Sequence, residues 1–74
     1  MSGDATIEIH VRVNGEVTAL PAGASVADLV ERLGHRPETV AVEVDRELVP
    51  RGERGRHRLS GGERVELVTL VGGG

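Results

Sequence analysis

Strict alternation of polar and apolar side chains over residues 6–13 constrains the fold more than any other feature of the chain. The apolar side of this segment consists of Ile7, Ile9, Val11 and Val13. A period of two residues is typical of a half-buried β-strand. The pair Asn14-Gly15 follows directly, and both residues readily take the positive φ angles of a type I′ turn. The sequence therefore predicts an N-terminal β-hairpin with residues 16–20 as its second arm.

A short amphipathic helix is predicted after the hairpin. Ser25 is a suitable N-cap, and Asp28, three residues further on, would lie near the positive end of the helix dipole. Apolar residues then recur with helical spacing at Val26, Leu29, Val30 and Leu33. Gly34 is typical of the residue that follows a helix. We expect a helix over residues 26–33 with one apolar face.

The rest of the chain reads as strands and connections. We expect a third strand over residues 40–44, a short strand at 48–49, a charged surface loop over 51–58 and a last strand over 64–71. Since a long crossover precedes the last strand, it should pair with the first strand at the sheet centre, with the helix across one face. This is an α+β fold with the β-grasp architecture of ubiquitin, a mixed sheet of four to five strands.

Length and composition narrow the function. The chain has 74 residues, which suits one domain, predicted over residues 1–71 with a flexible tail at 72–74. There is no Cys, Phe, Tyr or Trp, and the formal charge is −3. We therefore expect no nucleic-acid binding and no thiol chemistry. No apolar run is long enough to span a bilayer, so we expect no membrane association and a cytoplasmic protein.

Three consecutive glycines, Gly72, Gly73 and Gly74, follow the last predicted strand without a spacer. Glycine is costly to order and adds nothing to packing, so the tail is expected to act outside the domain. We expect the α-carboxylate of Gly74 to be the reacting group, on a thin arm formed by Gly72 and Gly73. A carboxylate is a poor electrophile and would have to be activated as a mixed anhydride with AMP before a nucleophile could attack it. The energy and the catalytic groups for this step would come from a partner. A frayed terminus or a cloning remnant is the alternative.

Val68 and Leu70 are candidate partner-docking residues. The last strand is apolar on both faces near its end, and only one face can meet the helix. If Val68 and Leu70 lie on the other face, they form an exposed apolar patch beside the tail. The alternative is that the charged loop at 51–58 covers this face.

The remaining charged residues suggest no catalytic or metal site. His10, His35 and His57 are scattered at spacings that suit no metal centre, and we interpret them as surface residues. The arginines of the charged loop are interpreted as solvated; these are Arg51, Arg54, Arg56 and Arg58.

Three segments carry a resemblance to a known family: VAVEVDRELVPR at 40–51, LSGGERVEL at 59–67 and VGGG at 71–74. Together with the early Val-Asn-Gly turn, they resemble the sulfur carriers of thiamin biosynthesis, the ThiS-like proteins, over almost the full chain. In two places the chain departs from the family. Asp45 stands where the family often has Asn, and three glycines in place of two leave open whether Gly72 belongs to the arm.

The resemblance implies a β-grasp carrier that acts in a cycle with partner enzymes. A ThiF-like enzyme would use ATP to adenylate Gly74, and a sulfur donor such as a cysteine desulfurase system would supply the sulfur that replaces AMP. The resulting thiocarboxylate would pass to a ThiG-like thiazole synthase. The chain would be no enzyme, would have no catalytic residue and would hold no cofactor, since ATP is used by the partner.

Three other functions stay open at this point. They are a sulfur carrier like the small subunit of molybdopterin synthase, a ubiquitin-like protein modifier, and an interaction module with an idle tail. The segment Val49-Pro50-Arg51 and the absence of aromatic residues at 68–71 favour the thiamin branch over the molybdenum branch.

Overall fold

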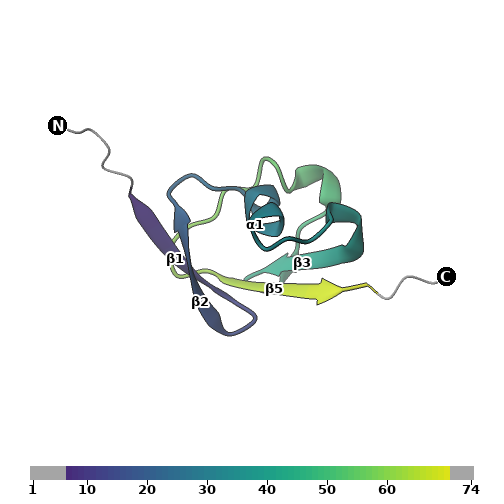
Figure 1. Ribbon diagram of the computed structural model, residues 1–74, viewed down its shortest axis with the longest axis horizontal. Coiled ribbons are helices and arrows are strands. Elements are labelled where there is room, and N and C mark those ends of the chain that lie inside the picture. The colour runs from purple at the N-terminus through teal and green to yellow at the C-terminus, as the bar shows by residue number, and fades with distance from the viewer. Residues whose placement is uncertain (1–6, 71–74) are drawn as a thin grey trace.

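A computed structural model describes residues 7–70 and shows a mixed β-sheet with one α-helix across one face (Figure 1). Five strands lie in the order β2-β1-β5-β3-β4. Their bounds, with the α-helix α1 and two short 3₁₀ helices, are β1 Glu8–Val13, β2 Glu16–Pro21, α1 Val26–Arg32, η1 Pro37–Thr39, β3 Val40–Val44, β4 Glu47–Leu48, η2 Arg51–Glu53 and β5 Arg64–Thr69. This arrangement confirms the predicted β-grasp fold.

The predicted hairpin is confirmed. Asn14 and Gly15 have φ angles of 50° and 88°, the left-handed conformation that a type I′ turn requires. β1 and β2 pair antiparallel, with Val13 opposite Glu16 and Ile9 opposite Leu20. Of the predicted apolar face, Val11 and Val13 are buried in the core and Ile9 packs against it. Ile7 lies before β1 and is 70% exposed, so the prediction is wrong for that residue.

Helix α1 begins and ends as the sequence indicates. A capping box forms at its start, where Ser25 Oγ accepts from the Asp28 N–H at 3.1 Å and Asp28 Oδ2 accepts from the Ser25 N–H at 2.9 Å. At its end Gly34 has a φ of 82°, and the His35 N–H reaches the Val30 carbonyl at 3.2 Å. The helix is shorter than predicted by one residue, because Leu33 is its C-cap.

The first and last strands lie side by side at the sheet centre, as predicted. β1 and β5 run parallel, with Val13 opposite Val65, and β3 runs antiparallel to the other edge of β5. Parallel neighbours need a long crossover, which here contains α1, β3 and β4. β5 is thus paired with β3 from Val65 to Thr69, but with β1 only at Arg64 and Val65.

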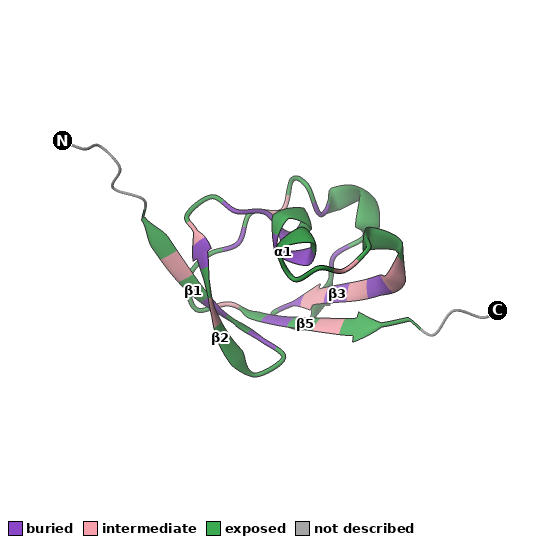
Figure 2. Ribbon diagram, viewed as in Figure 1, coloured by how far each residue is buried: buried purple, intermediate pink, exposed green. Residues whose placement is uncertain are grey.

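Aliphatic side chains alone form the core between α1 and the sheet. Its members are Val11, Val13, Leu20, Ala24, Val26, Leu29, Val30, Val40, Val42, Val44, Val49, Leu59 and Val65. Figure 2 shows buried positions alternating with intermediate ones along β3, and one buried position between exposed ones near the start of β5. Because α1 has only seven residues, its stability depends on burying this apolar stripe rather than on helix propensity.

Two 3₁₀ turns and one short strand differ from the predictions. Residues 37–39 form η1 and residues 51–53 form η2, where only irregular connections were expected. The short strand β4 is Glu47–Leu48 rather than 48–49. The tight turn at Asp45-Arg46, with φ angles of 49° and 72°, explains the difference in β4, because pairing resumes at once with Val44 opposite Glu47.

Candidate functional site

The candidate site lies at the C-terminal end of β5. This strand ends at Thr69, short of the predicted end at residue 71, and the N–H of the next residue, Leu70, donates to the Thr39 carbonyl at 2.7 Å. The predicted attachment point Gly74, the arm of Gly72 and Gly73, and Val71, the expected last strand residue, lie outside the described residues. What the structure defines is therefore the surface from which the tail begins.

Val68 and Leu70 lie on the face of β5 opposite the helix. Val65 is fully buried and Leu67 packs against the core, so the alternation along the strand turns Val68 and Leu70 outward. They are 58% and 51% exposed. The alternative that the loop at 51–58 covers this face is therefore wrong. Their role in docking stays a prediction.

Two residues that the sequence analysis did not select extend this apolar surface. Ala41 lies directly opposite Val68, and Leu48, 63% exposed, lies opposite Glu43 on the same outer face. We call Ala41, Leu48, Val68 and Leu70 the outer patch. The sequence contains a feature that could have predicted the outward position of Leu48. A two-residue turn at Asp45-Arg46 fixes the register of β4, and with it the side chains that face outward.

An apolar hollow adjoins the outer patch where β5 ends. Its volume is about 250 Å³, and its lining includes Pro37, Ala41, Leu48, Pro50 and Leu70. It lies beside the point where the tail leaves the sheet. A partner that receives the tail would meet both an exposed apolar patch and this recess.

Arg54 corrects the prediction of a fully solvated arginine loop. Its side chain is only 5% exposed, and its guanidinium donates to the carbonyls of Pro37 at 2.9 Å and Val40 at 2.8 Å. Burial lowers the pKa of the Arg54 guanidinium, and Arg51 lowers it further, but an arginine stays charged at neutral pH. Arg54 therefore fixes the segment around Thr39 that receives the end of β5.

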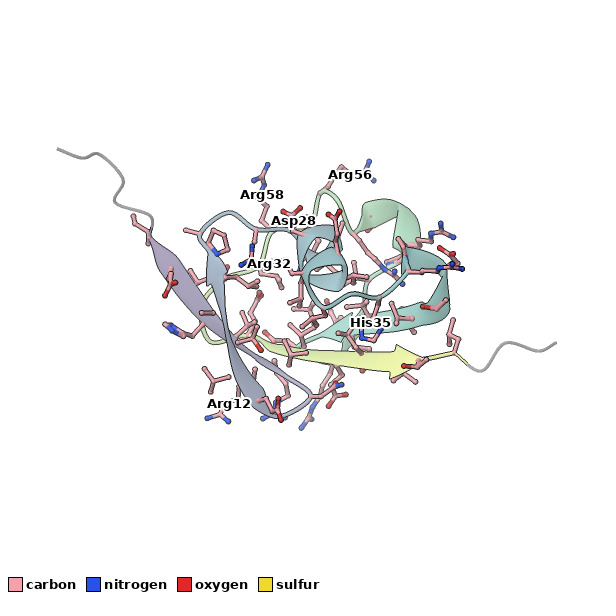
Figure 3. The ribbon with its side chains drawn as sticks, viewed as in Figure 1. Arg12, Asp28, Arg32, His35, Arg56 and Arg58 are labelled. Carbon is pink, nitrogen blue, oxygen red and sulfur yellow. The ribbon has the colours of Figure 1, made fainter. Side chains whose placement is uncertain are left out.

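The other loop arginines lie at the surface, as expected. Arg51 forms an exposed ion pair with Glu38 at 3.8 Å, a kind of contact that adds little stability. Arg58 donates to the Gly23 carbonyl at 3.0 Å. Figure 3 shows Arg56 and Arg58 projecting away from the sheet on the helix side.

The charged residue in the first turn of α1, Asp28, stabilises the helix, and nothing around it within residues 7–70 suggests a catalytic role. The Ser25 backbone N–H, and then the Ser25 hydroxyl, lower the pKa of the Asp28 carboxyl by hydrogen bonding. Arg58 and Arg32 add a smaller electrostatic effect in the same direction, and both lie near Asp28 in Figure 3. This carboxylate is committed to capping the helix.

The histidines do not come together in the fold. His10 is exposed, whereas His35 and His57 are partly buried in separate connections. Within residues 7–70, no three His, Cys, Asp or Glu side chains are grouped closely enough to hold a metal ion.

Comparison with known protein families shows to which family the chain belongs. The model of the ThiS family matches residues 11–74, a range that begins in β1 and includes the three glycines. The chain belongs to the ThiS family. This confirms the resemblance drawn from the residues at 40–51, 59–67 and 71–74.

Individual ThiS relatives agree with this assignment. A sulfur carrier protein ThiS of Escherichia coli is 26% identical over 66 residues, which cover 89% of this chain and all of that protein. The solved structure of a thiamine biosynthesis protein ThiS from Geobacter metallireducens superposes with a TM-score of 0.76 at 26% identity, covering 89% of this chain and all of that one.

A third relative has a different architecture. A thiazole synthase of Magnetococcus marinus is 38% identical over 66 residues, covering 89% of this ThiS family chain. The match spans only 20% of the thiazole synthase. A ThiS-like segment is therefore one part of a longer polypeptide in that relative.

In residues 7–70, α1 and the two 3₁₀ turns are all too short to cross a lipid bilayer.

Proposed function

We propose that this chain is a sulfur carrier of thiamin biosynthesis and that Gly74 carries the sulfur as a thiocarboxylate. The observation that supports this most directly is the family match over residues 11–74, which joins the β-grasp sheet and the glycine tail in one unit. The full-length match to a curated sulfur carrier of this family supports the same function. The fold contributes a rigid base, β5, from which the tail extends.

The proposed chemistry takes place on the Gly74 carboxylate. A carboxylate oxygen attacks the α-phosphorus of ATP and expels pyrophosphate, which gives an acyl adenylate. The terminal sulfur of a persulfide, supplied by a donor such as a cysteine desulfurase system, then attacks the acyl carbon and AMP leaves, which gives an acyl disulfide. A thiol of the partner enzyme acts as the reductant: it attacks the other sulfur of this disulfide, a new disulfide forms on the partner, and the thiocarboxylate is released. A ThiF-like enzyme supplies ATP and the catalytic groups. The carrier itself is no enzyme, holds no cofactor, and acts in the cytoplasm.

Thiazole synthase is the proposed acceptor of the sulfur. In one relative a ThiS-like segment shares a polypeptide with a thiazole synthase, which supports the proposal that a carrier of this family and that enzyme work together. A separate carrier needs to form a contact with that enzyme by docking. The same observation favours the thiamin branch over a molybdopterin-type carrier.

Intact mass spectrometry tests the proposal. The chain is incubated with its adenylating enzyme, ATP and a sulfur donor, and we expect a mass gain equal to replacing one oxygen by sulfur. A variant that lacks Gly74 should show no gain. Gly52→Ala serves as the matched control, because a methyl group at Gly52 meets open space, and it should gain sulfur at the wild-type rate.

Two results would overturn the proposal. An unchanged mass, under conditions in which an established ThiS protein is converted by its own enzyme, would leave the tail without this chemistry. Recovery of Gly74 in isopeptide linkage to lysines of other proteins would instead establish the modifier function.

A further inference from the structure

One edge of β5 is open near its C-terminal end. The Asp45 N–H donates to the Arg64 carbonyl at 2.8 Å, and the Leu70 N–H donates to the Thr39 carbonyl at 2.7 Å. Even-numbered residues of β5 thus direct their backbone groups toward β3. By the alternation of a strand, the odd-numbered residues direct theirs toward the opposite edge, where β1 lies.

β1 covers this opposite edge only in part. The Asn14 N–H donates to the Val65 carbonyl at 2.9 Å. One step further, the Asn14 side chain takes the place of a strand: its Oδ1 accepts from the Leu67 N–H at 2.9 Å and its Nδ2 donates to the Leu67 carbonyl at 3.3 Å. At Asn14-Gly15 the chain then turns away into β2.

Thr69 is the next residue that faces this edge. It pairs with Val40 at a position where the two residues exchange no backbone hydrogen bonds, since the bonds at Arg64 and Leu70 put this exchange on the even-numbered residues. Thr69 is exposed. Within residues 7–70, no neighbouring strand lies along the open edge to pair with its N–H and carbonyl. This is a short, unoccupied piece of strand edge immediately before the tail.

A hollow lies along the same edge. Its volume is about 360 Å³, and its lining includes Val13, Asn14, Leu33, His35 and Leu67. An added strand that pairs with Thr69 would run past this hollow and would place a side chain near it, because side chains of a strand alternate between its two faces.

The reach of the tail brings a partner close to the end of β5. Gly74 is four residues beyond Leu70, and four extended residues span at most about 14 Å. A partner whose active site holds Gly74 must therefore come close to the end of β5. A partner that covers the open edge removes water from the Thr69 N–H and carbonyl, and leaving both unpaired would be costly.

We propose that thiazole synthase presents an extended segment that pairs with the Thr69 N–H and carbonyl, so that it adds a strand to β5 and occupies the hollow lined by Leu33 and Leu67. Strand addition is a common way to recognise an exposed sheet edge. The inference rests on the proposed function, and the synthase is chosen because a relative combines a ThiS-like segment with that enzyme. The Asn14 side chain already bonds the N–H and carbonyl of Leu67. The added strand can therefore pair with β5 only beyond Leu67, beside the tail.

Amide hydrogen exchange tests the pairing without any mutation. In the free carrier the Thr69 amide should exchange rapidly, and the complex with thiazole synthase should slow it at least about tenfold. The Leu67 amide, already bonded to Asn14, is the internal reference and should change little. Unchanged exchange at Thr69 in the saturated complex, or protection only in the complex with the adenylating enzyme, would overturn the proposal.

Two variants separate the backbone donor from the side chain. Thr69→Pro removes the N–H on the open edge and should leave the β3 pairing intact, since Pro is tolerated at such positions. It should weaken binding to thiazole synthase about tenfold, the effect of roughly one lost hydrogen bond. Thr69→Val keeps the N–H and should bind within about twofold of wild type. Equal binding by wild type and Thr69→Pro would contradict the inference.

Mass spectrometry distinguishes this failure from a failure of the proposed function. Both variants retain Gly74 and should still gain sulfur from the adenylating enzyme and donor. If wild type gains sulfur but Thr69 is not involved in binding, only the strand addition is wrong. If wild type never gains sulfur, the carrier function itself is wrong.

Discussion

Asn14 and Leu67, 53 residues apart in the sequence, are joined by two hydrogen bonds between one side chain and one backbone unit. The Asn14 carboxamide has a donor and an acceptor, so it can replace the residue that would continue β1 along β5. The same residue starts the hairpin turn with a φ of 50°. One asparagine therefore ends the central strand pair and supports the strand that leads to the tail.

Replacing Asn14 by Gly should lower the free energy of unfolding by about 1 kcal/mol. Glycine can keep the left-handed turn but cannot form the two hydrogen bonds to Leu67. The decrease in the free energy of unfolding therefore measures the contribution of the Asn14 carboxamide. Urea denaturation measures it, and the Leu67 amide should exchange faster. Asn14→Asp is the matched control: it retains an acceptor for the Leu67 N–H and should fall between wild type and Asn14→Gly. Equal stability of all three proteins would contradict the assigned role.

Replacing Arg54 by Met should destabilise the fold by about 2–3 kcal/mol. Methionine fills part of the volume but leaves the carbonyls of Pro37 and Val40 without their buried donors. Thermal or urea denaturation measures the change. Arg56→Met, at an exposed position of the same loop, should stay within about 0.5 kcal/mol of wild type. A similar loss in both variants would assign the effect to the charge of the loop rather than to the two bonds.

Much of the fold could be predicted because its signals are local. Asn14-Gly15 specifies a hairpin, Ser25 and Gly34 mark the ends of a helix, and alternation marks the strands. The pairing of β1 with β5 followed from the crossover between them. The burial of Arg54 could not be predicted in this way, because it depends on where Pro37 and Val40 place their carbonyls in three dimensions. In sequence it is one arginine among several.

The candidate site was predictable to a similar extent. The period of β5 puts Val68 and Leu70 on one face, but the sequence left open whether another segment covers that face, and only the structure shows both side chains exposed. Leu48 joins the patch only through the register of β4, which the two-residue turn sets. The open edge at Thr69 depends on where β1 stops relative to β5, and no local pattern encodes that relation.

The pH dependence of stability should include a contribution from Asp28. Hydrogen bonds from Ser25 hold the pKa of this carboxyl below its ordinary value, which is about 3.9 in an unfolded chain. A lowered folded-state pKa gives stability that is fully present above about pH 4 and is lost as the pH falls through the folded pKa. Urea unfolding between neutral and strongly acidic pH should show Asp28→Asn losing less stability over this acidic range than wild type does. Parallel curves for the two proteins would contradict the assignment.

Arg46→Gly should raise the free energy of unfolding by about 0.5 kcal/mol. Arg46 has a φ of 72°, which strains a residue with a Cβ atom, and the gain is partly offset by the greater freedom of glycine in the unfolded chain. Asp45→Gly relieves similar strain but removes the Oδ1 that accepts from the Arg64 N–H at 2.8 Å, so it should not stabilise. Urea denaturation should therefore show a higher free energy of unfolding for Arg46→Gly and no increase for Asp45→Gly. Stabilisation by both changes would show that the Asp45 bond contributes little.

The outer patch should contribute to recognition by the adenylating enzyme, and Val68→Thr tests this with almost no change in shape. Threonine keeps a β-branched side chain that suits a strand, but its hydroxyl loses solvation when a partner covers it. We expect the KM of the enzyme for the carrier to rise about fivefold with kcat unchanged, which is the signature of lost ground-state binding.

Val17→Thr is the matched control for Val68, because it makes the same chemical change at a strand residue of similar exposure. Val17 is 63% exposed on β2, where its register opposite Arg12 puts it on the same outer face. β1 and β5 separate β2 from β3 in the sheet, so Val17 lies away from the end of β5 that leads to the tail. If docking is centred on the outer patch, Val17→Thr changes the KM by less than about twofold. Equal effects of the two substitutions would mean that the enzyme recognises the outer face of the sheet as a whole, and that the outer patch has no special role in binding.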